Sequence, residues 1–154
     1  IVVGHDLPDT LTIGDIHVRC VDMPHGEIWS TGFRFEHQGR SVGYATDFHE
    51  MTGAIADLFA GVNVWVVDAL REKPHPTHMH LAQTLDAIRD VAPERAYLTH
   101  MDNSMDYARL CAILPPAVRP AYDGLSELAV RPDSTPGESN RNIVRRPTRV
   151  HDGH

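Results

Sequence analysis

The first third of the chain carries strand patterns, in which apolar and polar side chains alternate with a period of two. Residues 16–23 alternate in the manner of a half-buried strand, and Pro24-His25-Gly26 ends it. Residues 28–36 and 40–46 repeat the pattern, and Gln38-Gly39 between them is typical of a tight hairpin turn. One face of the strand at 28–36 carries three aromatic side chains, Trp29, Phe33 and Phe35. Residues 1–10 are rich in turn formers.

The middle of the chain changes to helical spacing and then alternates between the two periods. Residues 51–60 have the apolar spacing of a helix, and residues 64–67 form a short, fully apolar strand. A second helix is predicted from Thr77, as its N-cap, to Val91, and residues 96–99 form the next apolar strand. Buried strands flanking a periodic helix are the sequence form of a βαβ unit, so the fold class is α/β. In such units ligands bind just beyond the C-terminal ends of the strands.

The last part of the chain has less regular patterns, which predict only short elements and an irregular tail. Ser104 is a plausible N-cap for a short helix that runs to Leu114, and residues 118–130 resemble two short strands. Residues 131–154 are rich in Pro, Gly, Ser, Asn and Arg, so they are expected to form a polar, mostly irregular tail. We therefore assign residues 1–130 to one folded unit and residues 131–154 to the tail.

Composition excludes two classes of function. The 154 residues are 42% hydrophobic, enough for a core, and no apolar run approaches the roughly 18 residues of a membrane span. The net charge of −7 argues against a nucleic-acid scaffold bound by bulk charge. Cys20 and Cys111 fall in apolar segments and are expected to be reduced core residues. We expect a soluble, cytoplasmic protein with neither nucleic-acid nor membrane partners.

Histidine is the unusual component, with eleven in the chain. Four ionisable residues share one placement, just past a predicted strand or at the start of a predicted helix: His25, Asp47, His78 and His100. Imidazole nitrogens and carboxylate oxygens are donors that Zn or Mn ions prefer, and an aspartate can bridge two ions. Taken singly, each residue has a simpler interpretation, because a strand-end aspartate is usually a turn former and a lone histidine usually a surface group. His75 and His80 stay undecided.

Taken together, short motifs in a fixed order carry a family resemblance. They are Tyr44-Ala-Thr-Asp47, Asp68-Ala-Leu-Arg71, His75-Pro-Thr-His78, Leu98-Thr-His100 and Ala121-Tyr-Asp-Gly124. This series resembles the metallo-β-lactamase-fold hydrolases, and within them the phosphodiesterase branch related to the cyclic phosphodiesterase of the phosphonate (carbon-phosphorus lyase) pathway. The resemblance implies an αββα sandwich, of which this chain supplies the C-terminal half with one mixed sheet and flanking helices.

The resemblance also implies a site and an activity. His25 would bind one divalent metal ion, Asp47 would bridge two, and His100 would bind the second, with Zn or Mn as the metals. His78 would face the scissile phosphate as a catalytic group. Arg71 and His75 are expected to help bind the substrate. The implied function is a phosphodiesterase that acts on a small or cyclic phosphate ester or a nucleotide through a metal-activated water.

Two features depart from the family pattern. The principal metal motif of the family, His-x-His-x-Asp-His, does not occur in this sequence, which implies a piece of a longer protein that is inactive by itself. Met101-Asp102-Asn103 stands where relatives often carry Ser-His. Thioester or lactone hydrolysis on the same fold, and a nucleotide- or phosphate-binding module without turnover, remain alternatives. A sheet with an uncovered apolar face also predicts a homo-oligomer.

Overall fold

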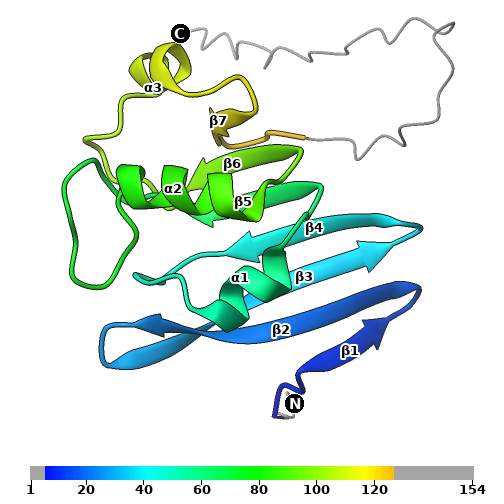
Figure 1. The fold of residues 1–154 in the computed structure, drawn as a ribbon. Coiled ribbons are helices and arrows are strands. Elements are labelled where there is room, and N and C mark those ends of the chain that lie inside the picture. Colours follow the sequence, from blue (N-terminus) through cyan, green and yellow to red (C-terminus); the bar gives the residue numbers. More distant parts are fainter. Residues whose placement is uncertain (1–5, 127–154) are drawn as a thin grey trace, which may run out of the picture.

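Residues 6–126 are the part of the chain that the computed structural model describes, and they form seven strands and three helices (Figure 1). The strands are β1 (Thr10–Ile13), β2 (Ile16–His25), β3 (Ile28–His37), β4 (Arg40–Ala45), β5 (Val64–Asp68), β6 (Arg95–Thr99) and β7 (Val118–Pro120). The helices are α1 (Gly53–Phe59), α2 (Leu81–Val91) and α3 (Tyr107–Ile113).

The strands form one mixed sheet and lie side by side in their order along the chain. Hairpins connect each of the first four strands to the next, so β1, β2, β3 and β4 run antiparallel to their neighbours. From β4 to β7 the strands run parallel, and the three helices connect them. The C-terminal ends of β2, β4, β5, β6 and β7 therefore lie at the same edge. This arrangement confirms the predicted α/β class with one mixed sheet and flanking helices.

The core lies between one face of this sheet and the helices. Figure 1 shows α1 and α2 in front of the strands, and buried residues of all three helices belong to the same apolar cluster. Phe59 of α1 packs on Trp65 of β5 with ring centroids 5.5 Å apart, and both side chains are fully buried. Gly43 permits this contact, because an added Cβ would lie 2.7 Å from Phe59 and 2.8 Å from Trp65. Burying two such rings contributes about 2–3 kcal/mol each, which fixes α1 against the sheet.

The opposite face of the sheet carries the predicted aromatic row. Trp29 is 69% exposed, and Phe33 and Phe35 are half-buried and stack with ring centroids 6.0 Å apart. A hollow of about 300 Å³ lies on this side near the turn between β3 and β4, where Phe35 and Val42 contribute to its lining. That turn is at the end of the sheet remote from the candidate site, so the hollow is not part of the site.

Several boundaries differ from the prediction for identifiable reasons. Helix α2 begins four residues after Thr77, because His80 is its N-cap and the Gln83 side chain accepts from the His80 backbone N–H at 3.2 Å. Ser104 does not cap α3, because its N–H and hydroxyl both donate to Asp102 Oδ1, at 2.8 and 2.6 Å. Asp106 caps that helix instead.

Other expectations meet a mixed outcome. Strand β1 was not predicted; its four residues, Thr-Leu-Thr-Ile, alternate polar and apolar, but three of the four side chains are exposed. Cys20 and Cys111 are both free thiols, but Cys111 lies exposed on α3, so its assignment to the core was wrong. Of the two strands expected within residues 118–130, β7 is present and the second, like the 131–154 tail, lies largely outside the described residues. Within residues 6–126 no helix is long and apolar enough to cross a bilayer.

Candidate active site

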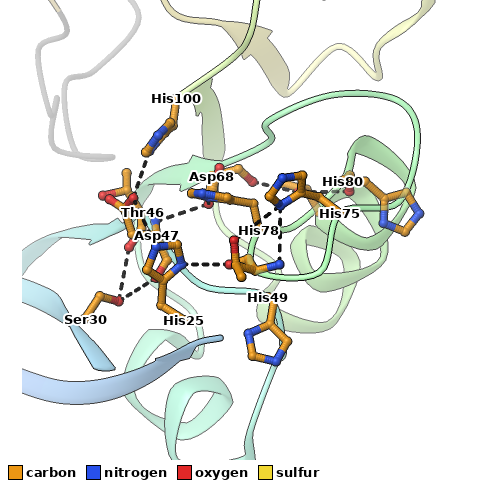
Figure 2. A network of polar contacts seen from close by, with 12 residues as sticks. His25, Ser30, Thr46, Asp47, His49, Asp68, His75, His78, His80 and His100 are labelled. Atoms are coloured by element: carbon orange, nitrogen blue, oxygen red, sulfur yellow. Dashed lines mark hydrogen bonds and ion pairs between the residues drawn. The ribbon is translucent and has the colours of Figure 1, made fainter. Parts of the chain in front are cut away.

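Four separate segments bring the predicted site residues together at one edge of the sheet. His25 ends β2, Asp47 follows β4, His78 lies in the loop between β5 and α2, and His100 follows β6. Figure 2 shows their side chains converging, with Asp47 Oδ1 lying 4.0 Å from His25 Nε2 and 3.5 Å from His100 Nδ1. The His78 ring centroid lies 4.6 Å from that of His25 and 4.9 Å from that of His100. The sequence placed these residues at element ends, and the topology brings those ends together.

The backbone is strained at two of these positions. Asp47 has a φ of 63° and His100 a φ of 57°, in the left-handed region that non-glycine residues seldom adopt. Such a conformation costs about 1–3 kcal/mol and persists only where surrounding contacts impose it. At Asp47 the imposing contacts are visible: its N–H donates to Asp68 Oδ2 at 3.1 Å, and its carbonyl accepts from the Ser30 hydroxyl at 2.7 Å.

The hydrogen bonds of His25 determine which of its nitrogens faces the site. His25 Nδ1 lies 2.8 Å from the Thr77 carbonyl oxygen, which can only accept, so Nδ1 carries the proton. In the neutral ring Nε2 then presents a lone pair toward Asp47 Oδ1. The turn after His25 can approach this loop closely because Gly26 lacks a Cβ, which would lie 2.7 Å from Thr77 Cγ2.

Asp68 orients His78 and was missing from the predicted site. Its side chain is fully buried at the end of β5, and its Oδ2 accepts from His78 Nδ1 at 2.9 Å. Burial raises the pKa of Asp68, while the hydrogen bond and positive charge of His78 oppose that shift. Because Nδ1 of His78 is engaged, Nε2 is the atom left to face the site. The sequence did offer a signal, since Asp68 ends an apolar strand, a placement close to that of Asp47 just after a strand.

The remaining predicted substrate groups lie in the loop before α2. The His75 ring centroid lies 5.1 Å from that of His78. Desolvation, and then the positive charge of Arg71, lower the pKa of His75, which favours its neutral form. The Arg71 guanidinium donates to the carbonyls of Lys73 and Pro74, at 3.2 and 2.8 Å, so it shapes this loop. The substrate-binding roles of Arg71 and His75 stay predictions.

Two other histidines have local structural partners and lie apart from the cluster in Figure 2. His49 Nδ1 lies 2.9 Å from the Pro24 carbonyl oxygen, next to the turn that ends β2. His80 caps α2 through Gln83. His80 was undecided from the sequence, and the structure gives it a capping role.

The donor set fits a divalent cation. A carboxylate oxygen of Asp47 lies between ring nitrogens of His25 and His100, and His25 turns a lone pair toward it. Two groups of three residues each bring their donor atoms within 4.8 Å of one another. One group is His25, Asp47 and His78, and the other is Asp68, His78 and His100. Acceptor atoms that face each other without protons repel unless a cation lies between them. Gathered at the edge of an α/β sheet, such donors form a candidate site for a divalent metal ion.

The family follows from comparison with known proteins. Residues 2–101 match the family model described as the β-lactamase superfamily domain. The chain belongs to this superfamily, and its described part has the metallo-β-lactamase type of fold. The prediction from the sequence motifs is thereby confirmed for the family and the fold.

Individual relatives resemble the chain over most of its length. A diphosphatase from the PhnP family is 29% identical, with a TM-score of 0.73 over 79% of this chain and 46% of that chain. Zn²⁺-bound PqqB from Methylobacterium extorquens is 16% identical, with a TM-score of 0.62 over 78% of this chain and 53% of that chain. An octanoyltransferase from Porphyromonas gingivalis is 23% identical over 128 residues, which are 82% of this chain and 25% of that protein. The chain thus spans about half the length of these solved structures and a quarter of the curated relative.

Proposed function

We propose that the protein carrying this chain is a metal-dependent phosphodiesterase that acts on a small or cyclic phosphate ester or a nucleotide. The observation that carries the proposal is the position of His78, whose ring lies between those of His25 and His100 and is oriented by buried Asp68. The 29% identity to a diphosphatase from the PhnP family supports phosphate chemistry. Because the chain spans less than half of that protein, the activity is proposed for the whole protein.

His25, Asp47 and His100 are the residues that would hold divalent metal, with Zn or Mn as the proposed ions. When bound, such ions polarise a phosphoryl oxygen and lower the pKa of a coordinated water. Two ions need a larger set of donors than these three residues provide. We therefore expect this chain by itself to bind metal weakly and to be inactive.

The proposed role of His78 follows from its hydrogen bond. With Nδ1 donating to Asp68, Nε2 is available to hold a phosphate oxygen or, when protonated, to pass its proton to the leaving oxygen. The negative charge of Asp68 would stabilise the imidazolium form that such a transfer requires. Asp68 therefore acts through His78 as a positioning residue, while His78 touches the substrate.

A comparison of three substrate classes tests the proposal. The full-length protein, loaded with Zn or Mn, is assayed with bis(4-nitrophenyl) phosphate, a thioester and a lactone, next to His78→Ala and a His49→Ala control. Phosphodiester turnover that falls in His78→Ala and persists in His49→Ala is the expected result. Turnover of only the thioester or lactone would contradict the phosphodiesterase proposal. Phosphate binding without any turnover would instead favour the binding module.

A further inference from the structure

An exposed pair of tyrosines lies outside the cluster already described. Tyr107 is 46% exposed and Tyr122 is 56% exposed, and their rings meet edge to face with centroids 6.0 Å apart and an interplanar angle of 84°. The two residues come from different elements, since Tyr107 begins α3 and Tyr122 follows β7. Single exposed aromatic residues are ordinary, but two that pack from separate segments form a preformed aromatic corner.

Strand register places Tyr122 next to the active-site edge. Leu98 of β6 pairs with Pro120 of β7, and the Ala121 N–H donates to the Leu98 carbonyl at 2.8 Å. Two residues beyond this pair are His100 and Tyr122, so both residues lie just past the C-terminal ends of neighbouring parallel strands. Tyr122 therefore lies at the same edge of the sheet as His100, a predicted metal ligand. The Leu125 N–H donates to the Tyr122 carbonyl at 3.0 Å, which fixes the turn after it.

An ion pair and a helix cap tie the start of α3, where Tyr107 lies, to the loop that carries His78. Arg109, in the first turn of α3, pairs with Glu72 at 2.5 Å, and Glu72 directly follows Arg71 in the loop that carries His78. Asp106 caps the helix by accepting from the Arg109 N–H at 2.7 Å. This ion pair connects helix α3 to the proposed substrate loop. Figure 1 shows α3 at the end of the sheet formed by β6 and β7.

We propose that Tyr107 and Tyr122 form a stacking site for the base of a nucleotide whose phosphate lies near His78, an inference that rests on the proposed function. Bases stack on aromatic rings through dispersion and quadrupole contacts, and a right-angled pair offers one ring by its face and the other by its edge. Among common phosphate esters, nucleotides carry a flat aromatic group, whereas sugar phosphates do not. The tyrosine pair thus selects nucleotides within the phosphate-ester class.

The neighbours of the pair suit this role. Hydrogen bonding to Cys111 is the first cause that raises the pKa of Tyr107, with desolvation second, so its hydroxyl stays protonated at neutral pH. The Arg119 charge is close enough to oppose this shift. A neutral phenol beside a cationic side chain accepts a polar heterocycle without charge repulsion.

The test compares ligands that differ only in the base or only in the phosphate. Full-length protein is titrated calorimetrically with AMP, ribose 5-phosphate and adenosine. Alanine substitution of an aromatic stacking partner typically weakens base binding about five- to a hundredfold. AMP is therefore expected to bind at least fivefold more tightly than ribose 5-phosphate, and Tyr107→Ala or Tyr122→Ala to reduce that preference. Tyr122→Phe, which keeps the ring, is expected to retain it.

Tyr44→Ala is the matched control, because Tyr44 is 43% exposed but lies on β4, away from the pair. Equal affinity of the native protein for AMP and ribose 5-phosphate, or an AMP preference that survives both alanine substitutions, would overturn the stacking site. Tyrosine-dependent binding of adenosine without binding of either phosphate would keep the stacking site and reject the phosphate-ester function. Absence of binding for all three ligands would reject both.

Discussion

The hydrogen bonds of Asp68 allow its charge to be separated from its geometry by two substitutions. The donors from His78 Nδ1 and from the Asp47 backbone both address Oδ2, at 2.9 and 3.1 Å. The other oxygen, Oδ1, is buried without a hydrogen-bond partner in the described structure. An asparagine can place its carbonyl oxygen at Oδ2 and its amide group at Oδ1. Asp68→Asn therefore keeps both hydrogen bonds and removes the charge, whereas Asp68→Ala removes all three.

These differences set the expected magnitudes. A hydrogen bond to a charged group contributes about 1.5–3 kcal/mol and one to a neutral group about 0.5–1.5 kcal/mol, so losing the charge costs roughly a factor of ten in kcat. Asp68→Ala also loses the orientation of His78 and is expected to lower kcat about 10²–10⁴-fold, like loss of the histidine itself. It leaves two buried donors unpaired, which is expected to lower the free energy of unfolding by about 2–4 kcal/mol.

The assay measures kcat on a phosphodiester, metal content and urea unfolding for both variants of the full-length protein. The pair is then repeated in a His78→Ala background, where removing Asp68 should cause little further loss of kcat if Asp68 acts through His78. An asparagine variant as impaired as the alanine variant, with native metal content, would refute the importance of orientation. Full additivity of Asp68→Ala and His78→Ala would refute the positioning role.

Four further predictions address the metal, the fold and the assembly. His78→Ala is expected to lower kcat about 10²–10⁴-fold with metal retained, and Asp47→Ala to lose metal; metal loss in the first would make His78 a ligand. Elemental analysis of the dialysed chain alone is expected to find well under two metal equivalents, and two would contradict the incomplete donor set. Ala92 has a φ of 52° at the end of α2, so Ala92→Gly is expected to raise the free energy of unfolding by about 0.5–1 kcal/mol. An unchanged or lower free energy in urea unfolding would contradict this prediction. Sedimentation is expected to show a homo-oligomer that buries the face carrying Trp29, and a micromolar monomer would contradict it.

Periodicity predicted the elements that bury one side, and it failed where tertiary contacts decide. Helix α2 and strands β5 and β6 have apolar faces packed in the core, so their patterns were visible in the sequence. Ser104 has the propensity of a cap but donates to Asp102 instead, and Thr77 supplies its carbonyl to His25. Propensity ranks candidate caps, but only the folded loop shows which hydrogen bonds compete for them.

The same limit applies to the site. The convergence of His25, Asp47 and His100 was predictable because each ends or closely follows a recognisable strand, and β2, β4 and β6 have their C-terminal ends at one edge. Asp68 shares that placement, yet it contacts His78 ten positions later in the sequence, and the sequence does not reveal the path of the loop between them. Sequence reasoning missed Asp68 because the role of this buried residue depends on its hydrogen bonds to His78 and to the Asp47 backbone, and not only on its position at a strand end.

The left-handed backbone at Asp47 and His100 was also beyond sequence reasoning, because neither position is a glycine. In a continuing strand, successive side chains point to opposite faces of the sheet. Asp47 and His100 meet instead beyond the ends of β4 and β6. A turn into the left-handed region ends the strand and lets Asp47 Oδ1 lie 3.5 Å from His100 Nδ1. Each such turn costs about 1–3 kcal/mol, which the buried Asp68 and the Ser30 hydroxyl help to offset at Asp47. Local preference is therefore violated at the two residues where the proposed metal chemistry needs a donor at the edge of the sheet.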